Sequence, residues 1–253
     1  MILEKFRLDG KVAIVTGAAR GLGQALATGM AEAGADVAAV DVLDTVETQD
    51  IIKRLGRKVT GIKADLVKGQ DRELIVQKTV KELSRVDILF NNAGIIRRAP
   101  FTDFTEKDWE DVIAINQSAV FYLSQLVVRQ FISQGGGGKI INTASMLSFQ
   151  GGILVPSYTA SKSAVMGLTR LMANELAKHR INVNAIAPGY MATDNTAPLR
   201  ADKDRNKAIL DRIPAGRWGE PDDLKGVAVF LASEASDYIN GYTIAVDGGW
   251  LAR

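Results

Sequence analysis

The 253-residue chain contains no cysteine and only one histidine, His179. The lack of cysteine excludes disulfide bonds, thiolate metal sites and cysteine nucleophiles, and it favours a reducing compartment such as the cytoplasm. A single histidine provides too little material for a histidine-based metal site or a Ser-His-Asp triad. We interpret His179 as a residue near the carboxyl end of a helix, where a cation complements the helix dipole.

The chain also lacks an excess of charge of either sign. Its 31 Lys and Arg residues and 29 Asp and Glu residues leave a net charge of +2, without a long run of one sign. This balance disfavours nucleic acid and anionic membranes as partners and favours a small soluble ligand. There is no run of roughly twenty uncharged apolar residues, and residues 1–11 contain no apolar core of signal length, so we expect neither membrane spanning nor secretion.

Short apolar runs that resemble buried β-strands recur along the chain. They are Lys11–Thr16, Asp36–Asp41, Lys58–Ala64, Val86–Asn91, Gly138–Ala144, Ile181–Ala187 and Thr243–Val246. Helical patterns lie between most of them, at Leu22–Gly34, Asp44–Gly56, Gly69–Ser84, Thr105–Gln134, Ser157–His179 and Pro221–Ser233. Alternating strands and helices predict an α/β fold in which helices cover both faces of a doubly wound parallel sheet. We expect residues 1–253 to form a single domain.

One stretch interrupts this alternation. Residues 189–214 contain Pro198, many charges and only short apolar runs. We expect one or two short helices here, in a mobile flap that follows the sixth strand. Doubly wound folds bind ligands outside the carboxyl ends of their strands, so the flap is expected to border a substrate site.

A glycine-rich turn joins the first strand to the first helix. Missing β-carbons let backbone N–H groups approach a pyrophosphate, and the amino end of the helix adds a favourable dipole. Such a turn can also be a mere connection, but its position between strand and helix favours dinucleotide binding. The residues expected to contact the dinucleotide here are Gly17, Arg20, Gly21, Leu22 and Gly23.

Asp41 ends the second strand, about twenty residues beyond the turn, where a carboxylate can accept hydrogen bonds from ribose hydroxyls. It would repel a 2′-phosphate. The sequence therefore predicts NAD(H) in preference to NADP(H), although Arg20 could reach such a phosphate. The alternative for Asp41 is a capping or turn role. Asp65 and Leu66, after the third strand, are expected to contact adenine.

Tyr158 and Lys162 lie four residues apart, so in a helix they share one face. Tyrosine, with a pKa near ~10, is a poor base at neutral pH, but a neighbouring ammonium and an oxidised nicotinamide both favour the phenolate. We expect Lys162 to supply that ammonium. Ser145, directly after the fifth strand, can orient and polarise a substrate oxygen. Such a Tyr/Lys pair alone is often a surface helix feature, but the upstream serine and the glycine turn favour hydride transfer.

Together these motifs resemble the short-chain dehydrogenase/reductase superfamily over the whole chain, which implies a Rossmann-type fold. The matching segments are Thr16–Gly23, Asn91–Gly94, Asn116, Ser145, Tyr158/Lys162 and Pro188–Gly189. The resemblance implies that Asn92 and Gly94 border the cofactor, and that Asn116 and Lys162 hold a water for proton relay. It also implies nicotinamide contacts, from Pro188, Gly189, Met191 and Thr193.

Further segments resemble one branch of that superfamily, the 2-dehydro-3-deoxy-D-gluconate 5-dehydrogenases, also called 2-deoxy-D-gluconate 3-dehydrogenases. They are Ile95–Arg98, Ser145–Gly152, Ile186–Thr193 and Asp247–Arg253. The branch implies NAD-dependent interconversion of 3-deoxy-D-glycero-2,5-hexodiulosonate and 2-dehydro-3-deoxy-D-gluconate, a step in the breakdown of pectin-derived uronates. Homotetramers are common in the superfamily, and both long helices carry apolar residues on more than one side. The alternatives are another short-chain dehydrogenase, such as a 3-oxoacyl-carrier-protein reductase or a sugar dehydrogenase, or a non-catalytic NAD-binding sensor.

A sugar acid needs a cation for its carboxylate. Arg97 and Arg98 follow the fourth strand, and a guanidinium binds a carboxylate in bidentate fashion. We expect one of them to anchor the substrate, although both could be solvated loop residues. Arg200 and Arg217 are further candidates, and Gln150 is expected to bind sugar hydroxyls together with substrate contacts from Ser145 and Tyr158.

Overall fold

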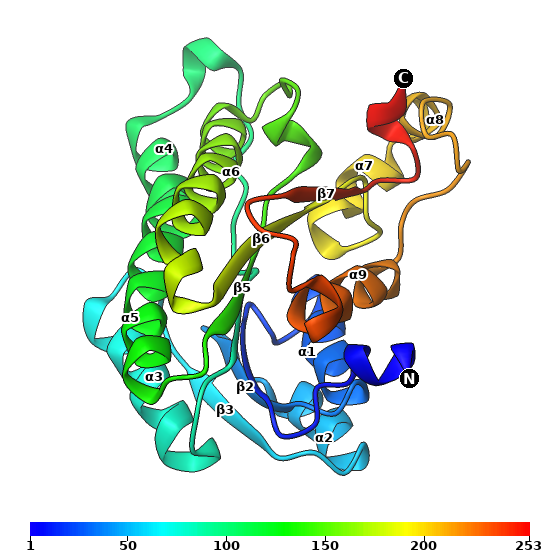
Figure 1. Cartoon of the computed structure of the whole chain (residues 1–253). Coiled ribbons are helices and arrows are strands. Elements are labelled where there is room, and N and C mark those ends of the chain that lie inside the picture. Colours follow the sequence, from blue (N-terminus) through cyan, green and yellow to red (C-terminus); the bar gives the residue numbers. More distant parts are fainter.

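A computed structural model describes residues 1–253. Its centre is one parallel sheet with the strand order β3-β2-β1-β4-β5-β6-β7 (Figure 1). The strands are β1 Val12–Thr16, β2 Asp36–Asp41, β3 Val59–Lys63, β4 Ile88–Asn91, β5 Gly138–Thr143, β6 Ile181–Pro188 and β7 Thr243–Val246. All seven predicted strands are present, and their ends differ from the predicted ones by at most two residues. The predicted doubly wound α/β architecture is confirmed.

Helices cover both faces of this sheet (Figure 1). They are α1 Gly21–Glu32, α2 Val46–Arg54, α3 Gly69–Leu83, α4 Glu106–Ile113, α5 Ala119–Gln134, α6 Pro156–Leu176, α7 Ala197–Ala201, α8 Lys203–Leu210 and α9 Lys225–Ala232. One hydrophobic cluster joins α1 and α9 to the sheet, and a second joins α3, α5 and α6 to it. Fully buried side chains such as Met30, Phe90 and Phe131 each contribute roughly 1.5–3 kcal/mol by leaving water.

The long helix expected over residues 105–134 is confirmed as a continuous helical run from Glu106 to Gln134. A π-helical turn, Ala114–Ser118, lies between α4 and α5 within this run, and it carries the buried Asn116. Such π turns occur often at functional sites. Residues 106–134 are long and apolar enough, by length and composition alone, for a membrane-spanning helix. The buried side chains of α5 pack in the hydrophobic cluster that joins α3, α5 and α6 to the sheet. We therefore interpret residues 106–134 as core helices and not as a membrane span.

Strand order reverses between β1 and β4, which is where a doubly wound sheet opens a crevice at the carboxyl ends of its strands. The predicted flap crosses this end of the sheet and contains two short helices, α7 and α8 (Figure 1). Ile209 and Ile213 of this segment pack with Met146 and Trp250. The flap is thus seated on the loop that follows β5.

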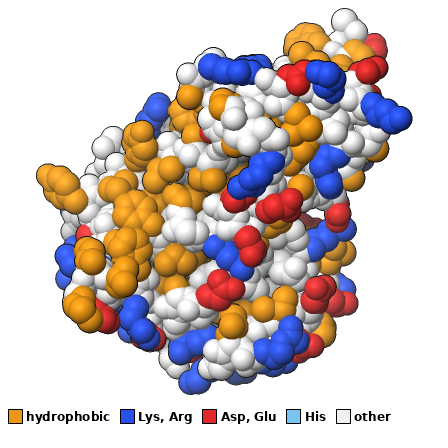
Figure 2. Space-filling model, turned by 90° about the vertical axis from the view of Figure 1, so that its right-hand side faces the viewer, with side chains coloured by type: hydrophobic (Ala, Val, Ile, Leu, Met, Phe, Trp, Pro, Cys, Tyr) orange, Lys and Arg blue, Asp and Glu red, His pale blue; other side chains and the backbone are white.

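Figure 2 shows one face of the molecule, on which positive and negative side chains are interspersed rather than gathered by sign. Hydrophobic side chains collect toward the left edge of the same view. Several large apolar side chains stay exposed on the surface of the chain, among them Phe121 and Tyr122 of α5 and Leu171 of α6.

Candidate active site

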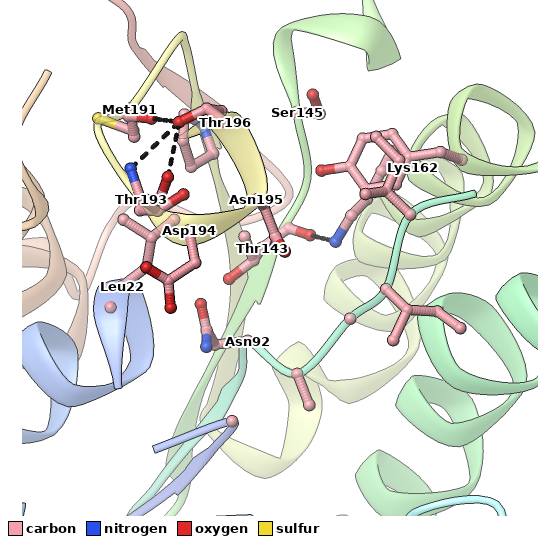
Figure 3. Close-up of a pocket in the computed structure, with 18 of the residues that line it drawn as sticks. Leu22, Asn92, Thr143, Ser145, Lys162, Met191, Thr193, Asp194, Asn195 and Thr196 are labelled. Atoms are coloured by element: carbon pink, nitrogen blue, oxygen red, sulfur yellow. Dashed lines mark hydrogen bonds between the residues drawn. The ribbon is translucent and has the colours of Figure 1, made fainter. Parts of the chain in front are cut away.

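A cavity of about 660 Å³ lies at the carboxyl ends of the strands, between the glycine turn, the flap and the start of α6 (Figure 3). Most of the predicted site residues line it. They are Gly17, Arg20, Gly21, Leu22, Gly23, Asp41, Asp65, Leu66, Asn92, Gly94, Arg97, Arg98, Ser145, Tyr158, Lys162, Pro188, Gly189, Met191 and Thr193. Tertiary structure therefore joins motifs that are separated by more than one hundred residues in the sequence.

The glycine turn is shaped for the close approach of a backbone to a ligand. Gly17 and Gly21 have φ values of +69° and +57°, which favour glycine. A β-carbon at position 23 would overlap the carbonyl oxygen of Gly17 and crowd the amide nitrogen of Asn92. The turn leads directly into α1, whose amino end favours an anion. These residues fit the pyrophosphate of a dinucleotide.

Asn92 ties the two strands at the switch point together. Its amide donates a 3.0 Å hydrogen bond to the carbonyl oxygen of Thr16, and its backbone N–H donates to the Thr16 hydroxyl over 3.0 Å. The Thr16 hydroxyl in turn donates to the carbonyl oxygen of Phe90. The floor of the cavity is therefore fixed by bonds between the ends of β1 and β4.

Asp41 has the turn role that the sequence left open. Its carboxylate accepts 3.0 Å hydrogen bonds from the backbone N–H groups of Ala19 and Leu43. It also lines the cavity, so the same carboxylate faces the space next to the glycine turn. Asp65 and Leu66 line the cavity after β3, at the place expected for adenine.

The opposite wall carries Ser145, Tyr158 and Lys162. The Ser145 hydroxyl accepts a hydrogen bond from the N–H of Leu147, which fixes the turn after β5. The Lys162 ammonium donates a 2.6 Å hydrogen bond to the carbonyl oxygen of Thr143 (Figure 3) and lies 5.7 Å from the centre of the Tyr158 ring. Both side chains of the Tyr/Lys pair thus face the cavity from α6.

Burial changes the titration of both members of the Tyr/Lys pair. Burial raises the pKa of Tyr158, and the hydrogen bond with Ser145 and the positive charge of Arg98 partly oppose that rise. Burial lowers the pKa of Lys162 from 10.5 to about 8. The charge of Arg98 is thus a second cation that favours the phenolate, and the expected effect of Lys162 on the phenol pKa stays a prediction. The Lys162 ammonium is directed at the Thr143 carbonyl.

Asn116 lies behind the cavity wall and does not line it. Its amide makes two 2.9 Å hydrogen bonds with the backbone of Ile95, donating to the carbonyl oxygen and accepting from the N–H. It also donates to the Ser161 hydroxyl over 3.3 Å. Asn116 therefore holds the loop after β4 against α6, and its part in a proton relay stays a prediction.

The predicted substrate residues divide into two groups. Arg97 and Arg98 line the cavity; Arg97 forms a 3.3 Å ion pair with Asp108, and Arg98 donates to the backbone carbonyl oxygen of Asn195. Three others lie outside the cavity lining: Gln150 accepts a hydrogen bond from Arg212, Arg200 donates to the Thr193 carbonyl oxygen, and Arg217 is paired with Asp223. The side chains of these three residues are thus directed at other partners, and the cavity lining does not include them.

Sequence reasoning missed two charged residues of the flap that line the cavity, Asp194 and Arg205. Asp194 forms a 2.8 Å ion pair with Arg20 and so connects the flap to the glycine turn. In the sequence both are ordinary members of a charge-rich segment, and no local pattern distinguishes them from their neighbours.

Comparison with known proteins agrees with this geometry. A family model described as Enoyl-(Acyl carrier protein) reductase matches residues 17–251. The 2-dehydro-3-deoxy-D-gluconate 5-dehydrogenase of Dickeya dadantii (strain 3937) is 64% identical over 253 residues, with 100% of both chains covered. The chain belongs to the short-chain dehydrogenase/reductase family. It is accordingly an oxidoreductase that acts on CH–OH groups with a nicotinamide coenzyme.

Other relatives extend the match. The Escherichia coli (strain K12) 2-dehydro-3-deoxy-D-gluconate 5-dehydrogenase is 61% identical over 253 residues, again with 100% of both chains covered. A solved structure of a putative 2-deoxy-D-gluconate 3-dehydrogenase from Agrobacterium tumefaciens, with bound NADP, is 51% identical with a TM-score of 0.90. The match covers 98% of this chain and 99% of that one. The family predicted from the motifs is confirmed.

Proposed function

We propose that this enzyme interconverts a keto group and a hydroxyl group on a 3-deoxy sugar acid, as a 2-dehydro-3-deoxy-D-gluconate 5-dehydrogenase. The observation that carries the proposal is the Ser145, Tyr158 and Lys162 wall facing a glycine turn across one cavity. The substrate class is supported by the two relatives of that name, which are 64% and 61% identical over the full chain.

Each residue of the wall has a separate task in the proposal. A bound nicotinamide coenzyme supplies the hydride for reduction and accepts it in oxidation. Tyr158 donates the proton to the substrate oxygen, and Ser145 donates a hydrogen bond that orients that oxygen. Lys162 binds the coenzyme ribose through its ammonium. Asn116 keeps Ile95 and α6 in register behind them.

For the coenzyme, we propose NAD(H) in preference to NADP(H). The support is Asp41, whose carboxylate lines the cavity beside the glycine turn and would repel a 2′-phosphate. Arg20, the cation that could bind such a phosphate, is paired with Asp194. The A. tumefaciens relative carries NADP, so the two coenzymes must be compared directly. Asp41→Ala should improve kcat/KM with NADPH and weaken it with NADH; unchanged ratios would overturn the preference.

The proposed substrate is tested with a panel of 2-keto and 2,5-diketo-3-deoxy sugar acids, using NADH and NADPH as reductants. We expect kcat/KM to be highest for the 2,5-diketo-3-deoxy acid with NADH. A higher kcat/KM for 3-oxoacyl thioesters or for neutral sugars would favour another short-chain dehydrogenase activity. An enzyme with the proposed substrate, the 2,5-diketo-3-deoxy acid, would act in the breakdown of pectin-derived uronates.

We further propose a homotetramer in the cytoplasm. Exposed Phe121, Tyr122 and Leu171 on α5 and α6 support an association of copies through these helices. The absence of cysteine suits a reducing compartment. Multi-angle light scattering at micromolar concentration should give four times the 27.2 kDa mass of the chain, and a monomer would contradict the assembly.

A further inference from the structure

A substrate carboxylate needs a cation that faces the cavity and is not already neutralised. Four arginines line the cavity, namely Arg20, Arg97, Arg98 and Arg205. Arg20 is paired with Asp194 and Arg97 with Asp108. Arg98 donates to a neutral carbonyl oxygen, and the Arg205 guanidinium has neither a hydrogen-bond acceptor nor an ion-pair partner. Among the cavity arginines, Arg205 is therefore the one whose guanidinium N–H groups are all free to bind a carboxylate.

The local structure of α8 holds Arg205 in this position. Asp202 caps the helix, because its carboxylate accepts hydrogen bonds from the N–H groups of Asp204 and Arg205 over 3.1 and 3.0 Å. At the end of the first turn, the Asn206 side-chain oxygen accepts a 2.7 Å hydrogen bond from the indole N–H of Trp218. Side-chain hydrogen bonds therefore hold the first turn of α8 at its beginning and at its end.

Helix periodicity places Arg205 on the inward side of α8, and the residue lines the cavity. Arg205 and Ile209 are four residues apart and share one face of α8. Ile209 is 1% exposed and belongs to the same buried cluster as Met146, the neighbour of Ser145. The face of α8 that carries Arg205 is accordingly the face that packs toward the loop after β5.

We propose that Arg205 binds the carboxylate of the substrate, with Arg98 as the second donor, and that it makes the site selective for sugar acids over neutral sugars. This inference rests on the proposed function, since it assigns the acid group of that substrate to a residue. Because Arg205 belongs to the flap, an acid bound there contacts the flap itself, whereas a neutral sugar does not.

The test compares Arg205→Met with Lys207→Met, which removes the same charge from α8 at an exposed residue outside the cavity lining. Initial rates are measured with NADH and two substrates, the keto sugar acid and its uncharged primary amide. Loss of a charge-assisted guanidinium pair should raise KM for the acid about tenfold or more. KM for the amide, kcat and the Kd for NADH should stay near the wild-type values, and Lys207→Met should resemble the wild type.

Two controls separate the loss of a carboxylate contact from a general loss of folding. They are the variant Arg205→Lys and the addition of guanidinium ion to Arg205→Met. The lysine variant keeps the charge and should show a smaller rise in KM for the acid than Arg205→Met. Added guanidinium chloride should lower KM for the acid in Arg205→Met, and sodium chloride at the same ionic strength should not. Equal KM changes for acid and amide, or an Arg205→Met variant with wild-type KM for the acid, would overturn the inference.

Failure of the proposed function looks different in the same experiment. A wild-type enzyme that binds NADH but reduces neutral sugars better than any keto sugar acid would refute that function, and the inference with it. A wild-type enzyme that prefers acids, combined with an unaffected Arg205→Met variant, would refute only the assignment of Arg205.

Discussion

The two sides of the cavity are held in different ways. The wall formed by Ser145 and Lys162 is buried, with both side chains at most 6% exposed, and buried hydrogen bonds connect its parts. The flap packs on the loop after β5 through Ile209 and Ile213, but the side chains of its ion pair with the glycine turn, Arg20 and Asp194, are 68% and 74% exposed. Exposed ion pairs contribute about 0–1 kcal/mol, whereas a buried partner left unpaired costs about 1–3 kcal/mol. The wall is therefore suited to fixed proton chemistry, and the flap to admitting and selecting a substrate.

The largest expected effect lies on the wall. Tyr158→Phe removes the proton donor and should lower kcat by about 10³-fold or more, because general acid catalysis by a positioned side chain is lost. Binding of NADH, followed by fluorescence titration, should change little. Turnover close to that of the wild type would refute the role of the phenol. The buried wall could then no longer be contrasted with the flap as the site of proton transfer.

A second prediction concerns the buried charge of Lys162, whose pKa is lowered to about 8. Between this pH and about 10.5 the unfolded chain binds more protons at residue 162 than the folded chain does, so stability rises with pH over that window. Relative to Lys162→Met, the wild type should gain up to about 3 kcal/mol of unfolding free energy across it. Urea denaturation at several pH values measures the difference, and parallel curves for the two proteins would contradict it.

Arg98 lies between the two regions, since it contacts the flap at Asn195 and acts on Tyr158 through its charge. Arg98→Met removes a charge that lowers the pKa of Tyr158, so that pKa should rise. In the direction of alcohol oxidation, which needs the phenolate, the pH profile of kcat/KM should move to higher pH. KM for the acid should also rise about tenfold, and far more than KM for an uncharged analogue. An unmoved profile would show that Arg98 contacts the flap but does not act on Tyr158.

The smallest effect is expected for the ion pair that connects the flap to the glycine turn. Asp194→Asn breaks the ion pair with Arg20 at an exposed position, so the unfolding free energy should change by less than about 1 kcal/mol. The freed Arg20 should lower KM for NADPH while KM for NADH stays similar, as steady-state kinetics would reveal. A loss of several kcal/mol would mean that the flap is as firmly held as the wall.

The elements with a local signature were predictable from the sequence. Alternating apolar and helical segments gave the sheet and its covering helices, and the spacing of Tyr158 and Lys162 placed both on one helix face. The interruption after β6 also predicted a flap with short helices. The π turn at Ala114–Ser118 was not predicted, because residues 105–134 were interpreted as one uninterrupted helical pattern.

Partner choice among the charged residues could not be read from the sequence. Arg97 and Arg98 are neighbours with the same chemistry, yet one pairs with Asp108 and the other crosses to the flap. Such outcomes follow from distances between segments far apart in the chain, which no local pattern encodes.

The sequence by itself determined the fold and the glycine turn, and it indicated the candidate reacting side chains. These depend on backbone periodicity and on the presence or absence of a β-carbon, which are local properties. Only the tertiary structure decided which arginine is neutralised, that the charge of Arg98 lies near Tyr158, and that Arg205 faces the cavity. Charge interactions depend on separation and burial in three dimensions, so the same residue types have different roles according to where the fold places them.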